Sequence, residues 1–163
     1  MTIQIDSREK ALAIKKITET FTQNNVDFYV SKLFVGDYMS LDNPRLVIDR
    51  KQNLSELCSN VCQQHDRFRR EIVRALENGI HIVFLCEHGS GISCLEDVIF
   101  WENPRGKKRS KTSDGCKEIR TKATTGETLY KILNTISAKY DVDFVFCDKE
   151  STGNMIIEIL KGR

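Results

Sequence analysis

Apolar and polar positions repeat with two different periods along the chain, and these periods separate strands from helices. Short alternating or continuously apolar stretches predict strands at 2–6, 26–32, 36–41, 45–50, 80–86 and 142–147. Apolar residues spaced three and four apart predict helices at about 7–24, 54–62, 64–78, 93–101, 124–140 and 154–160. Strands interleaved with helices, with no internal repeat and no linker, predict a single α/β domain over residues 1–163 with a mixed sheet.

Three features of these elements carry specific expectations. In the second strand, the alternation predicts that Val26, Phe28 and Val30 face inward. Ser7 is the expected cap of the first helix. The spacing of Thr124 and Glu127 is that of a capping box, which would open the helix that follows.

The composition is that of a soluble globular domain. Hydrophobic residues make up 40% and charged residues 29% of the 163 residues, which argues against wholesale disorder. The apolar runs are all too short for a membrane span of about 18 residues, and the first residues lack the apolar core of a secretory signal. We therefore expect an intracellular, cytoplasmic protein with no membrane partner.

The charge is unevenly distributed. The whole chain has a net charge of +2, but residues 103–122 hold eight Lys and Arg against two acids, Asp114 and Glu118. The remainder of the chain is therefore acidic. Such a basic segment is either a loop that contacts phosphates or a solvated, disordered loop, and the charges alone favour neither.

Six cysteines raise the question of a metal site. Cys58, Cys62 and His65 are spaced to share one helix face, and they could provide three ligands for zinc or part of an iron–sulfur site. No CxxC pair accompanies them and no fourth ligand follows. Buried, reduced thiols are therefore the favoured interpretation.

The strands at 36–41 and 45–50 bring together residues that could perform chemistry. An antiparallel pairing places Asp37 at the start of one strand near Asp49 at the end of the next. Asp49 and Lys51 share one face, while Arg50 points to the other. Two carboxylates repel unless a cation lies between them, and a hard divalent ion suits such ligands. The alternative is an exposed hairpin with a surface Asp–Lys salt bridge.

Two further groups flank this hairpin. Asp6 ends the first predicted strand and Glu9 lies in the first turn of the first predicted helix, and both would join the acidic cluster if that strand neighbours the hairpin. Otherwise they are simple partners of a helix N-terminus. Arg67, Arg70 and Arg74 form a ridge along one helix, which suits a phosphate backbone or pairs with neighbouring acids on a solvated face.

Four short motifs, in this order, resemble the nuclease domain of the XPF/Mus family of structure-specific endonucleases. They lie at residues 6–9 (D-S-R-E), 36–38 (G-D-Y), 47–51 (V-I-D-R-K) and 66–68 (D-R-F). The match covers about residues 2–90, and the rest fits the terminal α/β elements of that family. This resemblance implies a restriction-endonuclease-like fold of the PD-(D/E)xK class, in which helices flank a mixed β-sheet.

The resemblance also implies roles for individual residues. Asp37, Asp49 and the Arg50 carbonyl would bind Mg²⁺ or Mn²⁺, Lys51 would be the catalytic lysine, and Asp6 and Glu9 would complete the acidic cluster. DNA contacts are expected from eight basic side chains, namely Arg8, Arg50, Arg67, Arg70, Arg74, Lys107, Lys108 and Arg109.

The sequence departs from the family pattern in three places. Asp49 replaces the usual Glu, Ser55 stands nearest to the place of a later acid with Glu56 as the first acid present, and no helix-hairpin-helix module follows. The chain thus resembles stand-alone nuclease domains of bacteria and phages. We expect cleavage of branched or flapped DNA in repair, recombination or replication, a homodimer formed through helices 129–140 and 154–160, and no small-molecule cofactor. The alternative is a non-catalytic DNA-binding or dimer-partner module.

Overall fold

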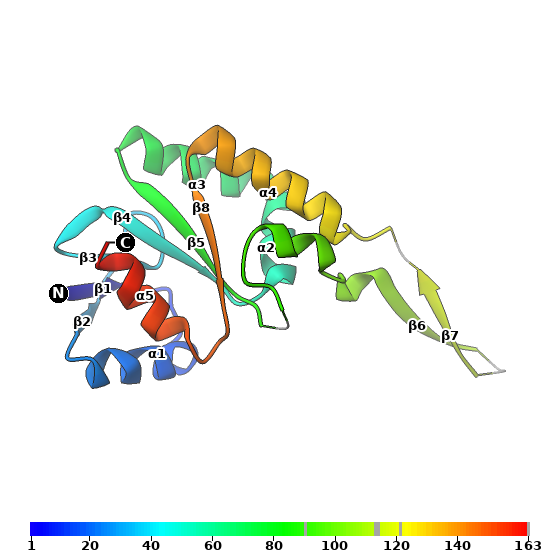
Figure 1. Ribbon diagram of the computed structural model, residues 1–163, viewed down its shortest axis with the longest axis horizontal. Helices are drawn as coiled ribbons and strands as arrows, with labels where there is room; N and C mark the ends of the chain where they lie inside the picture. The colour runs from blue at the N-terminus through cyan, green and yellow to red at the C-terminus, as the bar shows by residue number, and fades with distance from the viewer. Residues whose placement is uncertain (90, 113–114, 121, 163) are drawn as a thin grey trace.

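The computed structural model describes residues 1–163 except 90, 113–114, 121 and 163, and for 107–112 and 115–120 it describes the backbone alone. Helices and strands alternate as the hydrophobic pattern predicts (Figure 1). In chain order they are β1 Thr2–Ile5, α1 Ala11–Gln23, β2 Asp27–Val30, β3 Tyr38–Ser40, β4 Asn43–Lys51, α2 Leu54–Cys62, α3 His65–Glu77, β5 His81–Glu87, η1 Glu96–Phe100, η2 Pro104–Gly106, β6 Lys107–Thr112, β7 Gly115–Arg120, α4 Gly126–Tyr140, β8 Asp143–Cys147 and α5 Thr152–Leu160.

A six-stranded mixed sheet forms the centre of the fold, in the order β2-β1-β3-β4-β5-β8. β3 is antiparallel to both β1 and β4, whereas β1–β2, β4–β5 and β5–β8 are parallel pairs. This arrangement confirms the prediction of an α/β domain with a mixed sheet flanked by helices. It also places β1 directly beside the β3–β4 hairpin.

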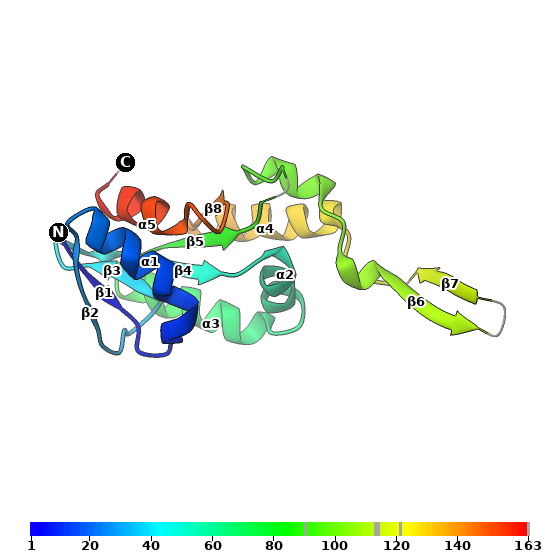
Figure 2. The same cartoon turned by 90° about the horizontal axis from the view of Figure 1, so that it is seen from below.

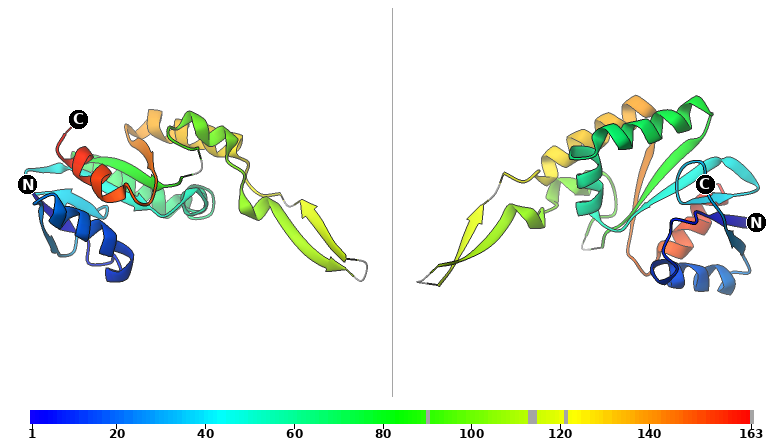
Figure 3. Two further views of the ribbon diagram at one scale, coloured as in Figure 1. Left: turned by 60° about the horizontal axis from the view of Figure 1, so that its bottom comes forward. Right: turned by 180° about the vertical axis from the view of Figure 1, so that it is seen from behind.

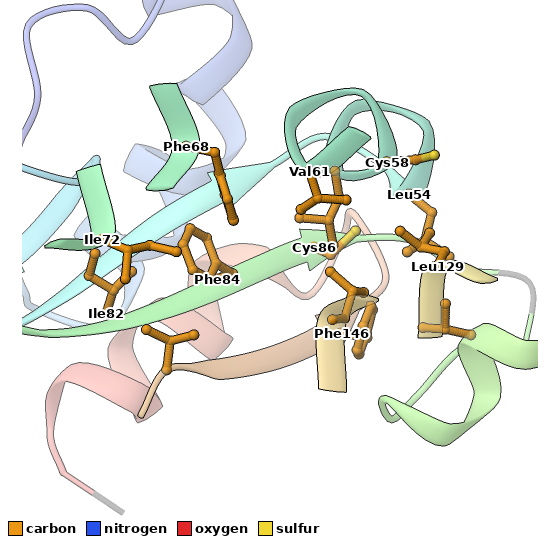
Figure 4. Packing of buried hydrophobic residues seen from close by; sticks show 14 of the residues in the cluster. Leu54, Cys58, Val61, Phe68, Ile72, Ile82, Phe84, Cys86, Leu129 and Phe146 are labelled. Carbon is orange, nitrogen blue, oxygen red and sulfur yellow. The ribbon is translucent and has the colours of Figure 1, made fainter. Parts of the chain in front are cut away.

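Helices cover both faces of the sheet, and the sheet divides the hydrophobic core into two clusters. On one face, α2, α3 and α4 pack against residues such as Val47, Phe84 and Phe146. Figure 4 shows the Phe68 ring over Phe84, with centroids 4.8 Å apart. On the other face, α1 and α5 pack against Ile48 and its neighbours. Figure 1 shows α3 and α4 above the strands and α1 and α5 below them, and in the view from below in Figure 2 α1 lies in front of the strands. Consecutive residues of β4 therefore point alternately into the two clusters.

The predicted burial of the second strand is confirmed at Val26, which is buried, and wrong at the next two positions of the alternation. Phe28 is 37% and Val30 is 55% exposed. β2 lies at the edge of the sheet and has a single neighbour, β1. An edge strand lacks cover on part of its surface, so an alternating pattern there does not ensure an inner face.

Two predicted helix starts are also wrong. α1 begins at Ala11 rather than near Ser7, because the Asp6 carboxylate accepts the Arg8 backbone N–H at 2.7 Å and holds a turn there. The cap of α4 is Thr125 rather than Thr124, and its side chain accepts the Thr128 N–H. Both shifts arise from local side-chain-to-backbone hydrogen bonds, which determine the terminal turn of a helix.

The segment where we expected a basic loop contains a two-stranded antiparallel sheet, β6–β7. Its register pairs Lys107 with Arg120 and Thr112 with Gly115. Both views of Figure 3 show this hairpin extending from the body of the domain. In the part of the chain described, no helix is long and apolar enough to cross a membrane.

Candidate active site

The β3–β4 hairpin positions Asp37 through its backbone. Gly36 has a φ of +71°, and a Cβ there would lie 3.0 Å from the Ile48 carbonyl oxygen, so a side chain at this position would be strained. Asp37 then donates its N–H to the same Ile48 oxygen at 2.7 Å. Its carboxylate accepts the Arg50 N–H at 2.8 Å. The Gly-Asp pair therefore brings a carboxylate against the backbone of β4.

Asp49 and Lys51 share the face of β4 that looks toward α3, as the alternation predicts. Lys51 Nζ lies 2.5 Å from Asp49 Oδ1, and both side chains are nearly buried. The ammonium also lies about 6 Å from the ring centroids of Phe68 and Phe84, at 6.0 and 5.9 Å. Burial lowers the pKa of Lys51, but the charge of Asp49 and its hydrogen bond outweigh this effect and raise the pKa. Lys51 is therefore a nearly buried ammonium group that Asp49 keeps in its charged form.

At Asp37, in contrast to Lys51, the surroundings disfavour the charged form of the side chain. Burial, the charge of Asp49 and the charge of Glu9 raise its pKa well above the usual range, and the Arg50 N–H and Lys51 only partly compensate. A buried carboxylate with a raised pKa beside a second carboxylate favours a cation that neutralises them. This is the electrostatic signature of a metal or proton site.

The donor set suits a hard divalent ion. Mg²⁺ commonly uses one or two carboxylates and keeps several waters, and Asp37 and Asp49 provide two carboxylates beside the Arg50 backbone. Among the described residues, no three His, Cys, Asp or Glu side chains are grouped closely enough to hold an ion by themselves. Waters or the carbonyl oxygen of Arg50 would therefore have to complete the coordination.

Arg50 points to the opposite face of the sheet and joins two acids there. Its guanidinium donates to Glu9 Oε2 at 2.6 and 3.1 Å and to Glu87 Oε1 at 3.1 Å. The Tyr38 hydroxyl also donates to Glu9, at 3.2 Å. The Arg50 side chain is 3% exposed. We call this group of ion pairs the Arg50 brace. Because the backbone N–H of Arg50 binds the Asp37 carboxylate, the brace also fixes β4 next to that carboxylate.

Glu87 was not predicted from the sequence as a residue of the site. It follows the apolar run of β5 and meets Arg50 because β5 is the parallel neighbour of β4, with Lys51 opposite Cys86. An acid directly after a buried central strand was the available signal. Glu9, which the resemblance placed in the acidic cluster, lies near Asp37 but binds Arg50 and Tyr38.

Asp6 has a fully engaged carboxylate. The Arg8 side chain and backbone N–H and the Leu33 N–H all donate to it, the last at 2.7 Å. Burial raises the pKa of Asp6, but these hydrogen bonds outweigh burial and lower the pKa. β1 does neighbour the hairpin, yet the Asp6 side chain joins the turn after β1 to the loop before β3. Arg8 is 58% exposed.

We expect Asp6→Asn to destabilise the domain by about 1.5–3 kcal/mol at neutral pH, the range for hydrogen bonds to charged groups. Since the folded-state pKa is lowered, the unfolded chain binds more protons as the pH falls. The contribution is complete above the unfolded pKa of about 4 and is lost as the pH falls through the folded value. Urea unfolding between neutral and acid pH measures it, with Asp27→Asn on the exposed edge strand as the matched control. Equal pH slopes in the two variants would contradict the assignment.

The predicted arginines occupy two different surfaces of α3. Arg67 lines a cavity of about 540 Å³ together with Lys51. Arg70 and Arg74 line a separate hollow, and the Arg74 guanidinium lies 5.7 Å from the Phe34 ring centroid. The side chains of Lys107, Lys108 and Arg109 lie outside the described part of the structure. Of these three arginines, Arg67 is therefore the one that the fold brings beside Lys51, the predicted catalytic lysine.

Among the residues whose side chains are described, Cys58 and Cys62 form no metal-binding group with His65. The Cys58 and Cys62 Sγ atoms are 4.0 Å apart, while His65 Nε2 contacts Asp66 at 3.2 Å. Burial raises the pKa of Cys58 to about 11. Cys86 and Cys147 are buried in the core, as expected.

The model of the ERCC4 domain family matches residues 5–159, which is nearly the whole chain. The chain belongs to the ERCC4 domain family. This confirms the resemblance to XPF-type nuclease domains that the four motifs predicted. No curated protein has a sequence that matches the chain significantly.

Solved structures agree with this assignment at the level of the fold. The ERCC4 domain described here resembles XPF from Aeropyrum pernix with a TM-score of 0.65 and 13% identity, over 99% of this chain and 64% of that one. XPF from the same organism in complex with DNA gives a TM-score of 0.59 and 13% identity, over 98% and 63%. The chain thus spans less than two thirds of the length of these structures. The restriction-endonuclease-like fold is confirmed.

Proposed function

We propose that this ERCC4 domain is a metal-dependent DNA endonuclease that hydrolyses phosphodiester bonds in branched or flapped DNA, in repair, recombination or replication. The proposal is supported above all by the convergence of Asp37, Asp49 and Lys51 on one face of the sheet. Family membership adds to this support, because the family contains nucleases. All three residues are present, whereas a non-catalytic module would be expected to have lost at least one.

Each residue would have a distinct part in the reaction. A bound Mg²⁺ or Mn²⁺ would polarise a phosphoryl oxygen and make water a better nucleophile at neutral pH. Asp37 and Asp49 would hold the ion, with the Arg50 carbonyl as a further ligand. The Lys51 ammonium, fixed by Asp49 and the rings of Phe68 and Phe84, would orient the attacking water or offset charge on the pentavalent phosphorane. Arg67 would bind a phosphate beside Lys51.

A cleavage assay with purified protein tests the proposal. Labelled flap, fork, four-way junction, linear duplex and single-stranded substrates are incubated with Mg²⁺, with Mn²⁺ or with EDTA. We expect cleavage of branched substrates with metal and none with EDTA. Tight, salt-sensitive binding without cleavage in either metal would instead support the non-catalytic alternative.

The homodimer that the resemblance implies is part of the same proposal. Light scattering at micromolar concentration would give twice the 18.7 kDa of one chain. A mass of 18.7 kDa would contradict the dimer and leave the cleavage assay unaffected.

A further inference from the structure

A polar cavity opens directly beside Lys51, between α2 and α3. Its volume is about 540 Å³, within the range of roughly 300–1,000 Å³ that is typical of ligand pockets. Of the described residues that line it, only Phe68 is apolar. Neutral donors and acceptors make up much of the wall, including Ser59, Asn60 and Gln64. Such a lining suits a sugar–phosphate unit better than an apolar ligand.

Cations reach this cavity from three separate elements. Lys51 comes from β4, Arg67 from α3 and Arg105 from η2. Two acids, Glu56 and Glu71, also line it, but the Glu56 carboxylate already accepts the Gln52 N–H at 2.8 Å. The side chains that line the cavity therefore carry three positive charges against two negative ones.

A second, smaller cavity continues from the first toward the root of the β6–β7 hairpin. It measures about 190 Å³, and both cavities are lined by Ser55, Ser59 and Arg105. Lys122 lines the far end. The root itself is held together because Asn103 Nδ2 donates to the Thr124 carbonyl at 2.9 Å. Positively charged side chains thus lie along a continuous path from Lys51 to the two chain segments that carry the hairpin.

The hairpin extends this path on the same side of the domain. Its strands run directly from η2 and return to the segment before α4 (Figure 1). The sequence of β6 is KKRSKT and that of β7 is GCKEIR, six cations and one acid. A two-stranded β-ribbon of this kind is one of the two elements that a DNA major groove admits.

We propose that these two joined cavities, which we name the α2 track, seat the DNA strand next to the scissile phosphate. Arg105 binds a backbone phosphate of this strand and directs the DNA onto the hairpin. The α2 track is defined by Lys51, Asn60, Arg67, Arg105 and Lys122. The inference rests on the proposed nuclease function for its substrate, and it adds the path of that substrate and singles out Arg105 from the basic segment as a phosphate-binding residue.

The first test measures DNA binding in EDTA, which removes divalent metal, so the result does not depend on whether the protein cleaves DNA. Fluorescence anisotropy gives the Kd of a labelled flap DNA over a series of KCl concentrations. Arg105→Gln is expected to reduce the slope of log K against log [salt] by about 0.7–0.9, the value of one phosphate contact. Arg105→Lys should retain the slope. Arg45→Gln, an exposed arginine at the far end of β4, is the matched control. A wild-type slope for Arg105→Gln would overturn the proposal.

The second test fills the track. Asn60→Trp places a large ring in the cavity, and Asn134→Trp on the exposed face of α4 is its matched control. We expect kcat/KM on flap DNA to fall at least about tenfold for Asn60→Trp alone. Hydrolysis of a chromogenic thymidine phosphodiester, which has no neighbouring nucleotides, should fall by a clearly smaller factor than cleavage of flap DNA. Unchanged flap cleavage by Asn60→Trp would overturn the proposal. If the wild type hydrolyses neither substrate, the proposed function fails. The salt dependence of DNA binding by Arg105→Gln would still test whether the DNA strand follows the α2 track.

Discussion

Asp49→Asn is expected to reduce cleavage of branched DNA by about 10³-fold. A metal ion contributes several kcal/mol of charge stabilisation to such reactions, and about 4 kcal/mol corresponds to this factor. Asn keeps the shape of the side chain but removes the charge that faces Asp37 and Lys51. The rate with Mg²⁺ under single-turnover conditions measures the loss, and Asp27→Asn on the edge strand provides the same substitution at an exposed site.

The same variant separates a loss of chemistry from a loss of structure. Asp49 lies 2.5 Å from the nearly buried Lys51 ammonium, so its neutralisation should cost about 1–3 kcal/mol of stability. The protein should nevertheless stay folded and bind DNA with an unchanged salt slope, because the phosphate contacts come from other residues. Normal cleavage by Asp49→Asn would exclude the assignment of this carboxylate to the metal. Lys51→Met, which keeps the aliphatic stem between Phe68 and Phe84, should also bind DNA without cleaving it.

Arg50→Met is expected to destabilise the domain by about 3–5 kcal/mol, the range for removing one partner of a buried ion pair. For a domain of this size, this corresponds to a Tm about 10 °C lower. The guanidinium is 3% exposed and binds both Glu9 and Glu87, so its loss leaves two carboxylates without their cation. Urea unfolding measures the change, and Arg45→Met, exposed on the same strand, is the control.

A rescue variant distinguishes the buried charge from the position of the strand. Adding Glu9→Gln and Glu87→Gln to Arg50→Met removes the uncompensated charges and should restore much of the stability. Cleavage should remain low, because the strand end that presents Asp37, Asp49 and Lys51 has lost its brace. Full recovery of cleavage in the triple variant would show that Arg50 serves stability alone. A stability of Arg50→Met equal to that of Arg45→Met would contradict the buried brace.

The local pattern of apolar and polar residues predicted much of the fold, because the spacing of buried side chains along a strand or helix follows directly from backbone geometry. The alternation along β4 placed Asp49 and Lys51 on one face and Arg50 on the other, as the structure has them. The bounds of α2 agree with the prediction at both ends. The errors at Phe28 and Val30 came from the position of β2 at the edge of the sheet, which a single strand does not reveal.

The candidate site was only partly predictable, since several of its residues meet through contacts that are distant in sequence. Asp37 and Asp49 were found because a hairpin joins neighbouring segments. Glu87 was missed because its partner Arg50 is 37 positions away, and the contact depends on the parallel pairing of β4 and β5. Arg105 was counted as one of several cations, and only the tertiary structure places it in one cavity with Lys51 and residues of α2.

By itself, the sequence determined the α/β class, the family and the carboxylate–lysine group, because these depend on short-range spacing and on motifs whose order is preserved. The tertiary structure decided how the acids are used. Asp6 holds a turn, Glu9 and Glu87 hold Arg50, and Asp37 and Asp49 lie close together beside Lys51. The physical reason is that a carboxylate's role depends on which donors the folded chain brings to it, and those donors lie on neighbouring strands and loops that spacing along one segment does not specify.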